Sequence, residues 1–326
     1  MLTLKVTIRT SEKLKRILEK SKRRRYRKLK KNQSYCTKSI ERRRIAMEQE
    51  YPFKWMERGR KRFGVLVTLI KVRLKLCGVK IRKLNTFDRS VCKGPIIFVP
   101  THIGKFDIEV AFACMNEHAL LLSGTEERMH GSPDGMFLEL NRVNYVDRGH
   151  KEDRKNSVLK MERDLKHGFH LLWFIEGTWN LSANRLVYPL SYSVIKLALE
   201  CNADIVPIGL NQVNRTMYVK FGEVFRPDEG KGLTESIAEL RDALATLKWD
   251  IYEYLQERQG VVKRSSLECN YWSDFLTERV KEWPMTDLEE ECNYVFQPKG
   301  DAYAYFEAFN TRVYVNADGE EIVERV

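Results

Sequence analysis

The sequence lacks the cysteine pattern of a disulfide framework or a zinc site. Its seven cysteines are odd in number and scattered, and no two of them form a C-x-x-C pair. Disulfide-rich secreted domains and zinc modules space their cysteines closely and regularly. The first residues also carry charge without the apolar core of a secretory signal. We therefore expect a protein of a reducing compartment, located in the cytoplasm.

Long apolar runs are missing too. In the most apolar of the N-terminal stretches, the longest run, Val65–Ile70, contains Thr68 and is followed by Lys71, whereas a membrane-spanning helix needs roughly 20 predominantly apolar residues. The surrounding stretch, Phe53–Cys77, mixes apolar residues with lysines and arginines at helical spacing. It predicts a helix that lies in a membrane interface without crossing it. A core helix whose lysines reach past the apolar surface is the alternative.

Positive charge is concentrated at the start of the chain. The net charge is +12, but residues 1–83 hold 29 Lys and Arg against 6 Asp and Glu, and the rest of the chain is acidic. Such a segment favours a polyanion, either an anionic lipid surface or a nucleic acid. The basic run 22–31 contains a single aromatic residue, Tyr26, which leaves little for base stacking. We expect an anionic membrane surface as partner, no nucleic acid, and a peripheral location on the inner face of the membrane.

The order of the predicted elements indicates an α/β fold with a mostly parallel sheet covered by helices, preceded by basic amphipathic N-terminal helices. The N-terminal helices are expected over 11–32, 37–50 and 53–77. Strands are expected at 79–84, 96–100, 120–123, 143–146, 171–175, 205–210 and 217–225. Helices are expected between and after them at 107–115, 133–140, 152–167, 192–201 and 233–259.

Three regions follow from this pattern. Residues 1–78 form a basic helical membrane-surface segment, and residues 79–262 form the α/β domain. Residues 263–326 form an appendage with a helix over 271–283 and a terminal hairpin of 312–316 and 321–326, which flank an Ala-Asp-Gly turn.

The first candidate site follows the apolar strand 96–100. His102 comes directly after this strand, and Asp107 opens the next helix five residues later. Active sites of parallel sheets form at the C-terminal ends of strands. A carboxylate that holds one imidazole nitrogen fixes the tautomer and leaves the other nitrogen as a base. The spacing alone is common, so a structural role for the pair remains open at this point.

Three further segments carry polar residues at strand ends. In Leu172–Asn180, the buried carboxylate of Glu176 needs a partner, Gly177 permits close backbone approach, and Thr178 offers a hydroxyl. Asn144–Arg148 places a guanidinium where it can grip a phosphate. Ile205–Leu210 reads as a buried strand that borders the site.

In this order, the four segments resemble the four sequence blocks of the glycerolipid acyltransferases, and most of all the 1-acylglycerol-3-phosphate O-acyltransferase (PlsC-like) branch. The resemblance covers about residues 80–225. It implies that His102 is the general base and Asp107 its orienting partner. It further implies that the acceptor site is made by Arg148, Glu176, Gly177 and Thr178. Pro207 would shape the side that takes the acyl donor.

The implied reaction moves a fatty acyl group from an acyl-CoA or acyl carrier protein thioester to a hydroxyl of a lysophospholipid. The thioester supplies the driving force, so no cofactor or metal is expected. Backbone N–H groups near Gly104 or Gly177 are candidates for the oxyanion site.

The third block departs from the family pattern Phe-Pro-Glu-Gly-Thr-Arg. Ile175 stands in place of the proline and Trp179 in place of the arginine. A cation that binds phosphate is thus absent from this position. Lys105 in the first block or Arg185 can substitute, although a lysine provides a point charge and no fork.

Two other functions are open. One is a nucleic-acid-binding or scaffold protein with a degenerate acyltransferase-like body, in which His102 and Asp107 would not approach each other. The other is an esterase, which requires a serine nucleophile, and the sequence has no G-x-S-x-G elbow.

The pair His167 and His170 has no carboxylate or cysteine to complete a metal site, so we expect it to be structural.

Overall fold

The computed structural model of the protein describes residues 38–124, 133–147, 150–180, 185–259, 274, 311–315 and 321–325. The chain divides into two compact units, residues 1–286 and 287–326. The predicted helix 11–32 lies outside the described residues, as does the predicted helix 271–283 except for Asp274, which is helical.

A seven-stranded sheet forms the centre of the first unit, with the order β1-β7-β6-β2-β5-β3-β4. All neighbouring strands run parallel except β6 and β7, which are antiparallel. The α/β fold with a mostly parallel sheet is therefore confirmed. The strands are β1 (Lys80–Lys83), β2 (Ile96–Pro100), β3 (Ala119–Ser123), β4 (Asn144–Tyr145), β5 (His170–Leu172), β6 (Asp204–Val213) and β7 (Thr216–Phe221).

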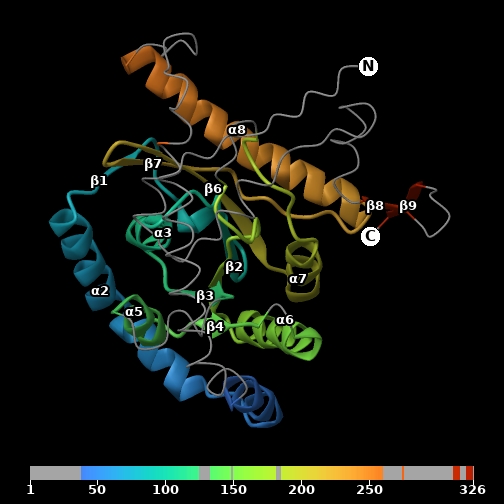
Figure 1. Cartoon of the computed structure of the whole chain (residues 1–326). Coiled ribbons are helices and arrows are strands. Elements are labelled where there is room, and N and C mark those ends of the chain that lie inside the picture. Colours follow the sequence, from blue (N-terminus) through green and yellow to red (C-terminus); the bar gives the residue numbers. More distant parts are fainter. Residues whose placement is uncertain are drawn as a thin grey trace. The chain divides into compact units, whose positions relative to one another are not determined.

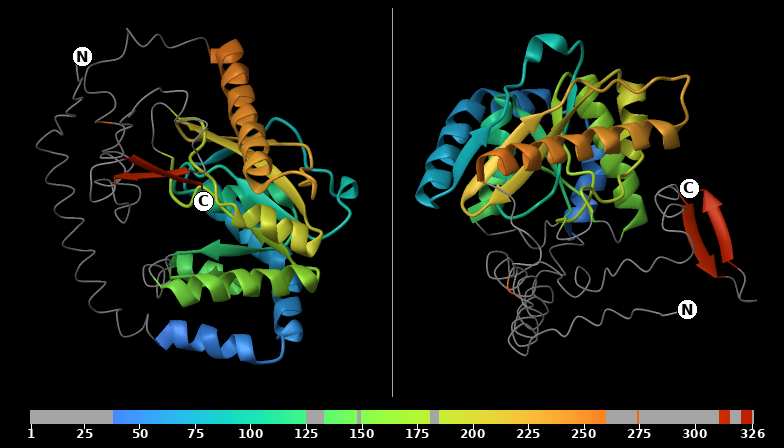
Figure 2. Two further views of the ribbon diagram at one scale, coloured as in Figure 1. Left: turned by 90° about the vertical axis from the view of Figure 1, so that its right-hand side faces the viewer. Right: turned by 90° about the horizontal axis from the view of Figure 1, so that it is seen from above.

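Helices lie along the sheet on both sides (Figures 1 and 2). They are a helix over residues 38–48, α2 (Phe53–Leu76), α3 (Asp107–Met115), α5 (Pro133–Leu140), α6 (Lys151–Lys166), α7 (Ser193–Cys201) and α8 (Leu233–Gln259). A short 3₁₀ helix, η1 (Arg89–Val91), precedes β2. Within the described ranges, no helix combines the length and the apolar character needed to cross a membrane.

The central strand β2 shows why both faces of the sheet are covered. All five of its residues are buried, and Ile96 and Phe98 join one core cluster while Ile97 and Val99 join the other. Successive side chains of a strand point to opposite faces, so an apolar strand without alternation requires cover on both. Apolar residues of α2 and α3 fill the first cluster, and those of α6, α7 and α8 fill the second.

Several predicted strands differ in length from the observed ones, and the largest differences are at the ends of β5, β6 and β7. β7 ends at Phe221, four residues before its predicted end. β5 ends at Leu172, three residues early, because a turn over Phe174–Gly177 follows it, closed by Gly177 N–H donating to Phe174 O at 3.0 Å. Gly177 has φ +76° in this turn, a value that glycine adopts readily. β6 runs three residues beyond Leu210, because its end pairs with the antiparallel β7.

The second unit contains the predicted terminal hairpin. Strands β8 (Thr311–Val315) and β9 (Glu321–Arg325) pair antiparallel, with Val313 opposite Val323.

Candidate active site

His102 and Asp107 lie together at the C-terminal end of β2. The His102 Nδ1 atom is 2.7 Å from Asp107 Oδ2. An ionised carboxylate can only accept a hydrogen bond, so Nδ1 carries the proton and Nε2 is left as the basic nitrogen. The Asp107 side chain is 1% exposed and that of His102 is 16% exposed, so the base reaches solvent while its partner does not.

The Asp107 carboxylate is held by the loop that precedes it. Its Oδ2 atom accepts hydrogen bonds from the backbone N–H groups of Ile103 at 3.0 Å and Gly104 at 3.1 Å, besides the one from His102. Asp107 is the first residue of α3, where the helix dipole favours a negative charge. Among the described residues, no hydrogen-bond partner reaches Oδ1. One oxygen therefore makes all the bonds that orient the carboxylate.

Glu176 ties together the loops that follow β2 and β5. Its Oε1 atom accepts from His102 N–H at 2.8 Å, and its Oε2 atom accepts from Tyr188 N–H at 2.8 Å and Asn180 Nδ2 at 3.2 Å. Asn180 N–H in turn donates to His102 O at 2.6 Å. Because β2 and β5 are neighbours in the sheet, these loops leave it side by side. Glu176 thus fixes the backbone of the residue that carries the candidate base.

The charge of Glu176 is buried beside a second buried ionisable group. Burial raises the pKa of Glu176, and the hydrogen bonds from Tyr188 and His102 and the charge of Lys248 oppose this change. Burial likewise lowers the pKa of Lys248, which lies on α8 and is 4% exposed. The two groups stabilise each other's charged form, as opposite charges in a protein interior do.

The two backbone groups expected at an oxyanion site are already paired. Gly104 N–H donates to Asp107 Oδ2 and Gly177 N–H donates to Phe174 O. The first bond orients the candidate dyad and the second closes the turn after β5. The N–H groups of these two glycines are thus engaged within the loops, and the expectation of an oxyanion site at a backbone N–H group near them stays a prediction.

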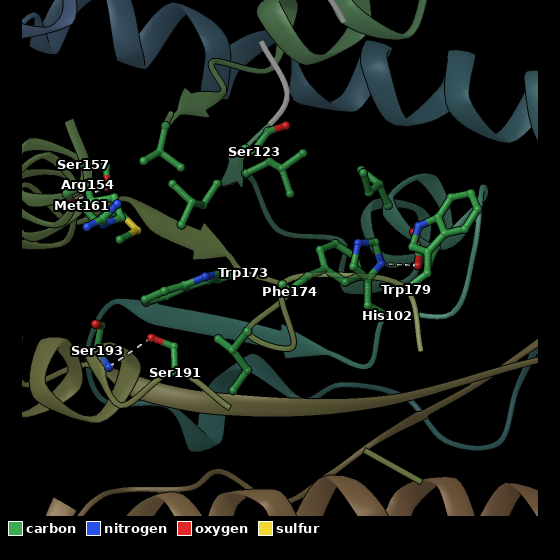
Figure 3. A pocket seen from close by; sticks show the side chains of 18 of the residues that line it. His102, Ser123, Arg154, Ser157, Met161, Trp173, Phe174, Trp179, Ser191 and Ser193 are labelled. Carbon is green, nitrogen blue, oxygen red and sulfur yellow. Dashed lines mark hydrogen bonds and ion pairs between the residues drawn. The ribbon is translucent and has the colours of Figure 1, made fainter. Parts of the chain in front are cut away.

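A cavity of about 350 Å³ opens beside His102 (Figure 3). This volume lies in the range of small-molecule sites, about 300–1,000 Å³. Trp173 lies between the two ends of the cavity, and Arg154 and Met161 lie together at the end opposite His102. A ligand in it meets a base at one end and a guanidinium at the other.

The structure divides the predicted acceptor-binding residues into three groups. Lys105 and Gly177 line the cavity together with His102 and Asp107. Glu176 and Thr178 do not line it, and the Glu176 carboxylate faces backbone N–H groups. Arg148 lies outside the described residues.

Trp179 takes part in the surroundings of the base. Its ring meets the His102 ring edge-on, with the centroids 6.4 Å apart, and Phe174 lies against the same imidazole at 4.4 Å. Trp179 is buried and lines the cavity. The position at which the family usually has an arginine therefore borders the candidate base directly.

Several residues that line the cavity were not predicted as site residues from the sequence. Arg154, Ser157 and Met161 lie on α6, and Ser191 and Ser193 lie at the start of α7. They come from helices that follow the recognised blocks, where no motif marks them. The positions of α6 and α7 along the sheet bring them to the cavity.

The histidines outside the cavity have structural contacts. His170 Nδ1 accepts from Ile96 N–H at 3.0 Å, and burial lowers the pKa of His170 to about 4. The ring of His167 stacks on that of Tyr51 with the centroids 3.8 Å apart. The described residues contain no group of three or more His, Cys, Asp and Glu side chains suited to a metal ion.

Comparisons with known proteins point to the same family as the four sequence blocks. A family model described as Acyltransferase matches residues 78–211. No curated protein matches the sequence. The solved structures that match include the 1-acyl-sn-glycerophosphate (LPA) acyltransferase PlsC from Thermotoga maritima, at 11% identity and a TM-score of 0.43, over 61% of this chain and 81% of that chain. The matched segment 78–211 contains all four sequence blocks, with His102 and Asp107, so the family model supports the resemblance found in them.

Proposed function

We propose that the protein is a lysophospholipid O-acyltransferase, which moves a fatty acyl group from a thioester to a hydroxyl of a glycerolipid acceptor. The observation that carries the proposal is the 2.7 Å contact between His102 Nδ1 and Asp107 Oδ2 at the wall of a cavity in an acyltransferase-family domain. In the scaffold alternative the site is inactive, and an inactive site has no need to keep a buried carboxylate on a partly exposed imidazole.

In this mechanism His102 Nε2 takes the proton of the acceptor hydroxyl as its oxygen attacks the thioester carbonyl. The carbon–sulfur bond then breaks, the thiolate leaves, and the imidazolium returns the proton to the sulfur. Asp107 stabilises the imidazolium and keeps the proton of neutral His102 on Nδ1. A positioned base of this kind contributes about 10²–10⁴ in rate.

The outer face of α2 supports a membrane surface as the place of action. One side of α2 packs on the core, while four apolar residues on the other side are exposed at helical spacing: Val65, Leu69, Val72 and Leu76. A helix of a globular protein needs a single apolar face. A second apolar face flanked by exposed cations such as Lys71 and Lys75 suits an anionic lipid interface. The buried side of α2 thus supports its interpretation as a core helix, and the exposed side supports its interpretation as an interface helix.

We expect Leu69→Glu to weaken binding to anionic phospholipid vesicles by about tenfold. The change removes one apolar side chain from the interface and adds a charge that the anionic surface repels. The measurement is vesicle co-sedimentation at two salt concentrations. Leu159→Glu is the matched control, because Leu159 is also exposed but lies on α6, which covers the other face of the sheet. Equal losses in both variants would contradict an interface on α2.

The acceptor headgroup is the second testable point. We expect lysophosphatidate to be accepted without a large preference over acceptors with a less anionic headgroup, because Trp179 provides an indole where the family has a guanidinium. Trp179→Arg should lower KM for lysophosphatidate and so raise its kcat/KM relative to a zwitterionic lysolipid. Trp179→Phe is the control, since it changes the ring without adding a charge.

The comparison is of kcat/KM for the two acceptors in the wild type and both variants. A wild-type preference for lysophosphatidate above about a hundredfold, roughly 2.7 kcal/mol, would mean that another cation fills the role of the missing arginine. Lys105 and Arg154 are the described cations that line the cavity.

An acceptor and donor screen tests the function itself. Purified full-length protein on anionic vesicles is given labelled acyl-CoA or acyl carrier protein thioester and a set of lysophospholipids. We expect label in a diacyl product with at least one donor. A protein that binds nucleic acid tightly and transfers no acyl group to any acceptor would support the scaffold alternative instead.

A further inference from the structure

The helix over residues 38–48 is joined to α6 by a buried ion pair. Arg43 Nε donates to Asp153 Oδ1 at 3.0 Å, and Arg43 Nη2 donates to Asp153 Oδ2 at 2.7 Å. The Asp153 side chain is 1% exposed and that of Arg43 is 17% exposed. Figures 1 and 2 show this helix next to α6. A two-bond fork of this kind fixes both distance and orientation.

The same carboxylate also holds the segment that follows β4. Asp147 N–H donates to Asp153 Oδ2 at 2.6 Å. Asp153 N–H donates to His150 Nδ1 at 3.2 Å, which caps α6, and His150 N–H donates to Asp147 O at 3.1 Å. Asp153 therefore connects three parts of the fold: the helix over 38–48, the start of α6 and the end of β4.

Two of the parts that Asp153 connects, the end of β4 and the start of α6, border the cavity. Val146, directly before Asp147, and Arg154, directly after Asp153, line the cavity, whereas Arg43 does not. The position of this part of the cavity wall thus depends on the Asp153 carboxylate. Without its arginine, the buried carboxylate is left as an uncompensated charge. A carboxylate that turns toward solvent for this reason loses the bond from Asp147 N–H.

We propose that Arg43 and Asp153 are positioning residues for the acceptor, and that the helix over 38–48 is part of the acceptor-binding apparatus. The ion pair sets the wall opposite His102 without touching the ligand. This inference rests on the proposed function, since it takes the cavity as the acceptor site.

The test compares Arg43→Met with Arg44→Met in the full-length protein. Arg44 lies on the same helix and pairs with Glu48 at 2.7 Å and Glu41 at 2.8 Å, both on that helix. The two variants lose the same charge from adjacent positions, so a loss of membrane attraction affects both alike. Arg43→Met should raise KM for the lysolipid about tenfold and leave kcat and the donor KM nearly unchanged. Arg44→Met should leave all three nearly unchanged.

Two further variants separate positioning from simple destabilisation. Asp153→Asn should raise the acceptor KM in the same way as Arg43→Met. Arg43→Lys should restore part of the loss, because a lysine keeps the charge but has no fork. Hydrogen exchange at the Asp147 amide should become faster in Arg43→Met and Asp153→Asn and stay unchanged in Arg44→Met.

Three results would overturn the inference. The first is an unchanged acceptor KM in Arg43→Met of an active enzyme, which leaves the proposed function standing. The second is a parallel loss of kcat and both affinities together with a lower Tm, which indicates a purely structural pair. The third is a wild type that transfers no acyl group, which overturns the proposed function and this inference together.

Discussion

Replacing His102 by alanine should lower kcat for acyl transfer by about 10²–10⁴, the usual contribution of a positioned general base. The fold should persist, because the His102 backbone keeps its bonds to Glu176 and Asn180, and the imidazole is partly exposed. The measurement is steady-state kinetics together with thermal unfolding. His167→Ala is the control, since His167 is an exposed histidine that does not line the cavity. Wild-type kcat in His102→Ala would remove His102 from the mechanism.

Asp107→Asn should cause the second largest loss, about 10²–10⁴ in kcat with little change in either KM. All three donors to Asp107 converge on Oδ2, and Oδ1 has no hydrogen-bond partner in the described part of the chain. An asparagine can therefore place its oxygen at the Oδ2 position and its NH₂ at the Oδ1 position without turning a donor toward a donor. The geometry survives while the charge that stabilises the imidazolium is lost.

Asp250→Asn provides the control for this substitution. Asp250 makes a partly exposed ion pair with Lys220 at 2.6 Å, and its neutralisation should leave kcat unchanged. A small effect of Asp107→Asn, below about threefold, would mean that Asp107 orients the loop and contributes nothing electrostatic to the transition state.

The alternation of apolar strands with helices was enough to predict the sheet and most helix bounds. The core strand β2 and helices α3, α5 and α8 begin and end at the predicted residues. Periodicity defines elements whose side chains are buried at a regular spacing. It did not define the end of β5, because a glycine turn there stops the strand inside an apolar run.

The candidate dyad was predictable, and the network around it was not. His102 and Asp107 are close in sequence and follow a strand, so local rules place them together. Glu176 was expected to meet an arginine or a substrate hydroxyl, whereas it accepts hydrogen bonds from His102 and Tyr188 N–H groups. Partners that lie on different loops depend on the strand order, which the sequence pattern does not contain.

The same limit applies to the pair of Arg43 and Asp153, which are 110 residues apart. The sequence shows a basic N-terminal segment and favours a membrane surface as its partner. It does not show that one arginine of that segment points inward and pairs with a buried carboxylate. Composition describes the average environment of a segment, while a single buried contact requires the tertiary fold.

The most direct test of the account is the rate at which full-length protein transfers labelled acyl groups to lysophospholipid on anionic vesicles, compared between the wild type and His102→Ala. We expect a labelled diacyl product with the wild type and a rate lower by at least about a hundredfold with the folded variant. Equal rates for the two proteins, or no product from the wild type with either an acyl-CoA or an acyl carrier protein donor, would contradict it.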